Sequence, residues 1–255
     1  MFKKILAASV LSGLAMASPV QAQPVPAAPA SMNAKELQLF ENGLLAAPTG
    51  PLFAALKQLY PREYGTLLDE MGALTLARLG DPAKLRAIGP DAMAKVFQRK
   101  TPDVINAPPL MLAKINQGQL DLIRALKAGH PRECAQFVMT GFDAQTVLPP
   151  TLHAKAVGVS VATLEAAKAG RELPRDPSRG SLNEQARRAW LAKMKEVAPS
   201  ARIGQIIMDD AAQQSATAEE KCQVGEAIYT AIEKLPPEQA ANIGAFMLAQ
   251  SLARD

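Results

Sequence analysis

Prolines and glycines divide this chain into a series of helical segments. A proline that opens a helix loses nothing by its missing N–H, because the first N–H groups of a helix have no acceptor within it, and a glycine suits the position just after the last turn. Segments that begin with proline and end at glycine cover residues 61–80, 82–89, 109–129 and 150–170, and Pro90 opens a further one. The pattern predicts many short helices joined by tight breaks.

Helix-start signals support the same interpretation. Asn33 followed by Glu36, Ser181 followed by Glu184, and Thr217 followed by Glu220 are spaced as capping boxes. Aromatic residues make up only 4% of the chain, and no convincing alternation of apolar and polar residues indicates a strand. We therefore predict an all-α fold of about ten helices, arranged either as a multi-helix bundle or as an irregular helical-repeat array.

A weak internal repeat favours the second arrangement. LFAALKQLYPRE at Leu52–Glu63 aligns with LIRALKAGHPRE at Leu122–Glu133, and AIEKLPPE at 231–238 resembles both more faintly. A helical-repeat scaffold would present a concave binding surface. The alternative is that proline and glutamate are simply common at helix starts, and the irregular spacing of the copies favours that explanation.

The first residues have the composition of an export signal. Lys3 and Lys4 precede a short apolar core, and an A-x-A-like cleavage site ends at Ala22. We expect a signal peptide over 1–22, a flexible Pro/Ala-rich leader over 23–32, and helical units over 33–129 and 130–255, with one continuous domain over 33–255 as the alternative. No later run is long enough to span a membrane, so the expected location is periplasmic or secreted.

Cys134 and Cys222 are the two cysteines of the chain. In an exported protein two thiols are best explained as a disulfide, because oxidising compartments form and keep such bonds. The bond would close the chain between these positions into one loop and tie the middle of the protein to its last quarter. The alternative is a reactive thiol at Cys134 beside His130.

Catalytic and metal-binding motifs are missing from the sequence. There is no HExxH, CxxC, G-x-S-x-G or phosphate-binding glycine loop, and the two histidines, His130 and His153, are expected at the surface or at helix ends. We therefore predict no metal and no cofactor. If the protein were a hydrolase acting on a cell-wall polymer, Glu63 or Glu133 would be the first candidates for its carboxylates.

One stretch has a pronounced excess of basic residues. Loss of Lys3 and Lys4 with the signal would leave a net charge of only +2, which does not favour nucleic-acid binding. The segment 168–195, however, holds eight basic and three acidic residues. Its candidate contacts for an anionic partner, such as an acidic protein surface or an anionic component of the cell envelope, are Arg175, Arg179, Arg187 and Arg188. The alternative is a solvated helix face and linker.

The favoured function is therefore non-catalytic. We expect a binding, adaptor or chaperone-like module of the cell envelope, without nucleic acid as a partner and with no prediction of oligomeric state. The alternatives are the envelope hydrolase already mentioned and a carrier whose helices enclose a small apolar ligand. A deep pocket with convergent carboxylates would favour the enzyme, whereas a groove or an apolar patch would favour a binder.

Overall fold

The computed structural model describes residues 31–143, 146–176 and 178–252, and within these ranges the chain forms helices and no strands. The signal peptide expected over 1–22 and residues 23–30 of the expected leader lie outside the described residues. The described helices are α1 (Ala34–Ala46), α2 (Gly50–Leu59), α3 (Pro61–Ala77), α4 (Pro82–Ile105), α5 (Pro109–Lys127), α6 (Pro131–Met139), α7 (Pro150–Arg171), α8 (Glu184–Val197), α9 (Ala201–Met208), α10 (Asp210–Gln214), α11 (Ala218–Glu233) and α12 (Pro237–Leu252). The all-α prediction is confirmed.

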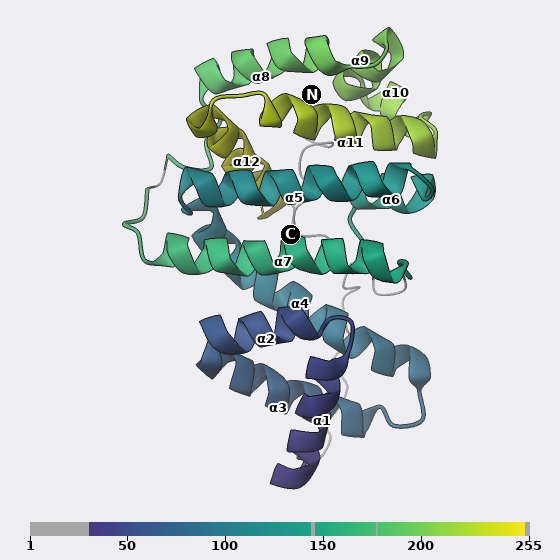
Figure 1. Cartoon of the computed structure of the whole chain (residues 1–255), viewed down its shortest axis with the longest axis vertical. Helices are drawn as coiled ribbons and strands as arrows, with labels where there is room; N and C mark the ends of the chain where they lie inside the picture. Colours follow the sequence, from purple (N-terminus) through teal and green to yellow (C-terminus); the bar gives the residue numbers. More distant parts are fainter. Residues whose placement is uncertain (1–30, 144–145, 177, 253–255) are drawn as a thin grey trace.

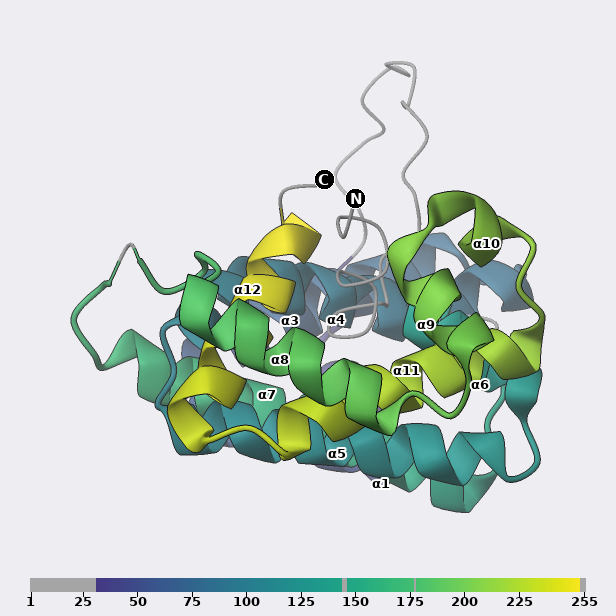
Figure 2. The ribbon, with the colours of Figure 1, turned by 90° about the horizontal axis from the view of Figure 1, so that it is seen from above.

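The helices form a two-layered stack. In Figure 1, α8, α11, α5 with α6, α7 and α2 lie in successive rows, and each row packs on the next. In the view of Figure 2, α3, α4 and α12 lie together on one side of α5 and α7, and they form the second layer. Two helices join the ends of the stack: α7 packs against α2, α4 and α5, and α12 packs against α4 and α5.

Helix starts follow the expected capping chemistry, with one shift. Capping boxes join Asn33 to Glu36 and Thr217 to Glu220. Helix α8 begins two residues later than expected: its N-cap is Asn183 instead of Ser181, and the Asn183 side chain accepts hydrogen bonds from two backbone N–H groups. Asparagine is as good an N-cap as serine, and Ser181 is instead held by Asn242, whose amide donates to its carbonyl at 3.0 Å.

Helix α4 runs through the break that was expected at Gly89 and Pro90. A proline inside a helix removes one backbone hydrogen bond and costs about 3 kcal/mol or more. The helix continues because residues on both sides of Pro90 are buried, among them Ile88, Met93 and Val96, and packing supplies most of the stability of a helix in a protein.

The two copies of the internal repeat share one backbone break. Tyr60 ends α2 with φ −140° and ψ 60°, and His130 precedes α6 with φ −134° and ψ 57°. Both precede a proline, which disfavours helical geometry in the residue before it. The repeated sequence therefore specifies the same local turn twice.

Buried apolar residues form two core clusters. One is centred on Leu126, Trp190 and Ile228, and the other on Leu56, Met71 and Leu164. Each cluster contains residues from both sides of the boundary expected at residue 129. The division into units 33–129 and 130–255 remains a prediction, as does the single domain 33–255.

The expected cysteine pair is brought together. Cys134 of α6 and Cys222 of α11 are fully buried, with Cα atoms 5.3 Å apart and sulfur atoms at disulfide-bonding distance, although 88 residues separate them in sequence. Among the helices that the structure describes, none combines the length and the apolar character needed to cross a bilayer.

Candidate functional site

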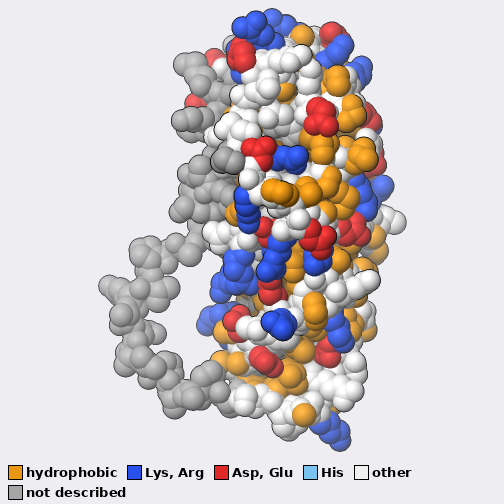
Figure 3. Space-filling view, turned by 90° about the vertical axis from the view of Figure 1, so that its left-hand side faces the viewer, with side chains coloured by type: hydrophobic (Ala, Val, Ile, Leu, Met, Phe, Trp, Pro, Cys, Tyr) orange, Lys and Arg blue, Asp and Glu red, His pale blue; other side chains and the backbone are white. Residues whose placement is uncertain are grey.

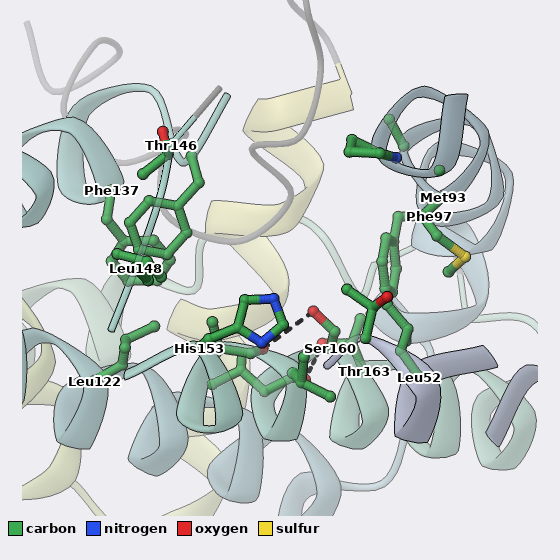
Figure 4. A pocket seen from close by; sticks show the side chains of 18 of the residues that line it. Leu52, Met93, Phe97, Leu122, Phe137, Thr146, Leu148, His153, Ser160 and Thr163 are labelled. Carbon is green, nitrogen blue, oxygen red and sulfur yellow. Dashed lines mark hydrogen bonds between the residues drawn. The ribbon is translucent and has the colours of Figure 1, made fainter. Parts of the chain in front are cut away.

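A cavity of about 380 Å³ opens between the two core clusters. Its walls come from α2, α4, α5, α6, α7 and the segment that follows α6 (Figure 4). The larger apolar side chains that line it are Leu52, Phe53, Met93, Phe97, Leu122, Phe137, Phe142, Leu148, Val157 and Val159. Its size lies in the range of small-molecule pockets, about 300–1,000 Å³.

The position of the cavity follows from the fold. Leu122 and Phe137 belong to one core cluster, whereas Phe53 and Met93 belong to the other. The two clusters meet across α7, and the space that neither fills is the cavity. Pro90 also lines it, so the discontinuity in the hydrogen bonds of α4 lies in its wall.

Aromatic rings define one wall. Phe137 of α6 stacks on Phe142 with ring centroids 4.9 Å apart and an angle of 27° between the planes. Cys134, one turn earlier on α6, lies against Cys222 of α11. The covalent link expected between α6 and α11 would therefore fix the helix that carries this wall.

A polar stripe crosses the apolar lining on α7. His153, Ser160 and Thr163 are spaced at i, i+7 and i+10, which places them on one helical face, and all three border the cavity. Figure 4 shows the His153 and Ser160 side chains rising from the same side of the helix. A largely apolar pocket with a few convergent polar groups is typical of a ligand site.

The hydroxyl protons of this stripe already have acceptors. Ser160 Oγ donates to the carbonyl of Ala156 at 3.2 Å, and Thr163 Oγ1 donates to the carbonyl of Val159 at 2.8 Å. At the other side of the cavity, Thr146 Oγ1 lies 2.9 Å from Asp143 Oδ1 and 3.2 Å from Gln136 Oε1. All three oxygens therefore retain lone pairs but no uncommitted proton.

Asp143, His153 and Ser160 border the same cavity, but their geometry is not that of a hydrolytic triad. A serine nucleophile must give its proton to the imidazole, whereas the proton of Ser160 is directed to its own helix. Within the described part of the chain no hydrogen bond joins Ser160 to His153. The arrangement suits binding better than acyl transfer.

In the basic loop between α7 and α8, two of the four predicted arginines hydrogen-bond to other residues of the same chain. Arg175 donates to the carbonyl of Pro102 at 2.9 Å and to Asp103 Oδ1 at 2.5 Å. Arg179 donates to the carbonyls of Asn106 and Ala107 at 3.2 and 2.5 Å. Pro102 lies in the last turn of α4, Asn106 is the residue that follows its end, and Ala107 comes next. Both arginines therefore bind near the C-terminus of α4, where cations are favoured because the last C=O groups have no partner in the helix.

The other two arginines converge on one carboxylate. Arg187 Nε and Arg188 Nε lie 2.7 and 2.8 Å from the two oxygens of Glu184. Hydrogen bonds from Arg187, and then from Arg188, lower the pKa of Glu184 to about 2. The loop between α7 and α8 borders the face of the molecule that Figure 3 shows, and basic and acidic side chains lie interspersed on that face. Contact of the four arginines with an anionic partner remains a prediction.

The two carboxylates proposed for hydrolysis are not close to the cavity residues. Glu63 Oε1 lies 2.5 Å from Lys100 Nζ, and Arg171 lies 3.7 Å from the same oxygen. Glu133 lies beside His130, with 4.0 Å between its Oε2 and the imidazole Nδ1. The two glutamates do not border the cavity, and within the described chain no three His, Cys, Asp or Glu side chains gather where they could hold a metal ion.

Comparison of the chain with protein-family models, with curated proteins and with solved structures finds no match. The site must therefore be interpreted from its own geometry.

Sequence reasoning missed the cavity and its polar stripe. It placed His153 at the surface or at a helix end; the residue lies in the first turn of α7, but it is half-buried and borders the cavity, which was not expected. The available signal was the spacing of His153, Ser160 and Thr163 on the side of α7 that also carries Val157. The spacing alone does not distinguish a lined cavity from ordinary packing.

Proposed function

We propose that this protein binds a small, largely apolar molecule in the cavity between α2, α4, α6 and α7. Among the functions predicted from the sequence, this proposal corresponds to a non-catalytic ligand-binding protein or a carrier of a small apolar ligand. The observation that carries it is the cavity itself, which has the volume of a ligand pocket and a lining of aliphatic and aromatic side chains. Transfer of apolar surface from water into such a lining is favourable by about 25 cal/mol per Å².

The fold supports a binder of this kind in a further way. The cavity lies where two core clusters meet, and α7 contributes to both of them. Much of the lining comes from helix faces, and the segment after α6 supplies Phe142, Asp143, Thr146 and Leu148. Side chains that are already held on packed helices lose less conformational freedom when a ligand enters. The charged clusters at Glu63 and at Glu184 are satisfied by internal ion pairs.

We also propose that the protein acts outside the cytoplasm. The buried cysteine pair supports this location, because an oxidising compartment would keep it as a disulfide. The sequence of residues 1–22 supports it as well, as the expected export signal.

Binding can be tested with the neutral fluorescent probe N-phenyl-1-naphthylamine, whose emission rises in apolar surroundings. The test variant is Ala156→Phe, which places a ring in the cavity, and the control is Ala154→Phe on the exposed side of the same helix. We expect saturable binding to the unmodified protein and to the control, and loss of binding in Ala156→Phe. Equal signals from all three proteins would show that the probe binds elsewhere and would contradict the proposal.

A further inference from the structure

The polar atoms of the cavity indicate which kind of ligand it accepts. Ser160, Thr163 and Thr146 each present an oxygen whose proton is directed to a protein acceptor. Turning a hydroxyl away from its present acceptor, a backbone carbonyl for Ser160 and Thr163 and a side-chain oxygen for Thr146, would give up this bond, at a net cost of about 0.5–1.5 kcal/mol. These oxygens are therefore set to accept hydrogen bonds from a ligand.

Donors are few around the cavity. Among the described residues that line it, none is lysine or arginine, and the side chains with other polar hydrogens are His153 and Thr49. A carboxylate or phosphate buried here would have no lysine or arginine as a partner, and burial of an unpaired charge is strongly unfavourable. Asp143 at the edge would add repulsion.

We propose that the ligand is a neutral amphiphile with an aliphatic body and a hydroxyl group, which lies along the stripe of α7. This inference rests on the proposed function of the cavity. The ligand hydroxyl donates its proton to Ser160 Oγ or Thr163 Oγ1, while His153, about two turns before Ser160 on the same helix, lies at the other end of the stripe. A hydroxyl is a small uncharged group that can donate to one of these oxygens.

The aliphatic body lies on the apolar walls. Leu52, Met93 and Phe97 line the cavity beyond the Thr163 end of the stripe, and Leu122, Phe137 and Leu148 line the His153 side (Figure 4). The body supplies most of the binding free energy through burial, and the hydroxyl fixes the orientation of the ligand.

Three probes of equal chain length test the inference: 1-decanol, decanoate and decane, each used to displace N-phenyl-1-naphthylamine at neutral pH. We expect 1-decanol to bind about tenfold more tightly than decane, which corresponds to about 1.4 kcal/mol for the hydroxyl contacts, and decanoate to bind more weakly than 1-decanol. Equal displacement by all three would overturn the inference and leave the proposed function standing. Failure of the fluorescent probe itself to bind would instead remove the proposed function.

Substitutions locate the hydroxyl contact. In Ser160→Ala and Thr163→Val we expect the preference for 1-decanol over decane to fall several-fold while the affinity for decane stays the same. The matched control is Thr75→Val, because Thr75 Oγ1 donates to the carbonyl of Met71 at 2.8 Å in the same way but lies on α3, away from the cavity. A preference that survives in both cavity variants, or that falls equally in the control, would contradict the assignment.

Discussion

Phe137 stacks on Phe142 with ring centroids 4.9 Å apart, and the pair forms the wall of the cavity next to the buried cysteines. This wall of the cavity is thus attached to fully buried residues of the core. Helix α6 carries Phe137, and its Cys134 faces Cys222 of α11. Stability and binding are therefore expected to change together when the contact between α6 and α11 is altered.

The first prediction concerns the cysteine pair. Replacement of both Cys134 and Cys222 with serine should lower the free energy of unfolding by up to about 4–5 kcal/mol, because a cross-link across this length of chain restricts the unfolded state. Denaturant titration measures the change. In the unmodified protein, made in an oxidising compartment and denatured without reductant, we expect no reactive thiol; two reactive thiols would contradict the disulfide.

The second prediction concerns the packing of α6 on α11. A Cβ added at Gly225 would lie close to the Val138 side chain, well inside contact distance. Gly225→Ala should therefore destabilise the protein by about 1–3 kcal/mol. Gly158→Ala is the control: Gly158 lies in α7 with open space around it, so alanine should leave stability unchanged or raise it by up to about 1 kcal/mol. Equal thermal midpoints for the two variants would show that α6 and α11 are not packed as described.

The third prediction concerns the loop arginines. Arg175→Gln and Arg179→Gln should loosen the loop between α7 and α8, because they remove hydrogen bonds to the end of α4 and leave the buried Asp103 carboxylate without its partner. Limited proteolysis within residues 172–183 should become faster. Arg188→Gln is the control, since that side chain is largely exposed and, among the residues that the structure describes, pairs with Glu184 of the same helix. A cleavage rate that does not differ from that of the control would contradict the capping role.

Part of the fold can be predicted from the sequence, and part of it cannot. The capping boxes at Asn33 and Thr217, the helical class and the cysteine pairing follow from local chemistry, because the side chains that decide them are near in sequence or chemically unique. Pro90 shows where local rules fail: it is a helix breaker by itself, but packing around Ile88 and Met93 keeps α4 continuous. The cavity depends on how α2, α4 and α7 meet, and no single helix contains that information.

The fourth prediction concerns pH. Burial, and then the negative charges of Asp103 and Glu63, raise the pKa of Tyr60 well above its usual value of 10; burial, and then Glu41, do the same for Tyr64. A raised pKa means that the folded state favours the neutral phenol. The contribution of each buried phenol to the free energy of unfolding is therefore present below about pH 10, and it is lost as the pH rises further.

The free energy of unfolding, measured by denaturant titration between about pH 9 and about pH 12, should consequently fall more steeply in the unmodified protein than in the variant Tyr60→Phe/Tyr64→Phe. Lysines titrate over the same range in both proteins, so the difference between the two slopes isolates the tyrosines. Parallel curves would show that the two phenols ionise as freely in the folded state as in the unfolded one.

The most direct test of the account is to locate a bound ligand by NMR in protein labelled at the methionine methyl groups. Met93 lines the cavity and is buried, whereas Met208 is exposed at the end of α9 and serves as the internal control. On saturation with 1-decanol, the account predicts nuclear Overhauser contacts between the ligand and the Met93 methyl group and none with Met208. Contacts at Met208 without contacts at Met93, under conditions where binding is saturated, would contradict the claim that this cavity is the binding site.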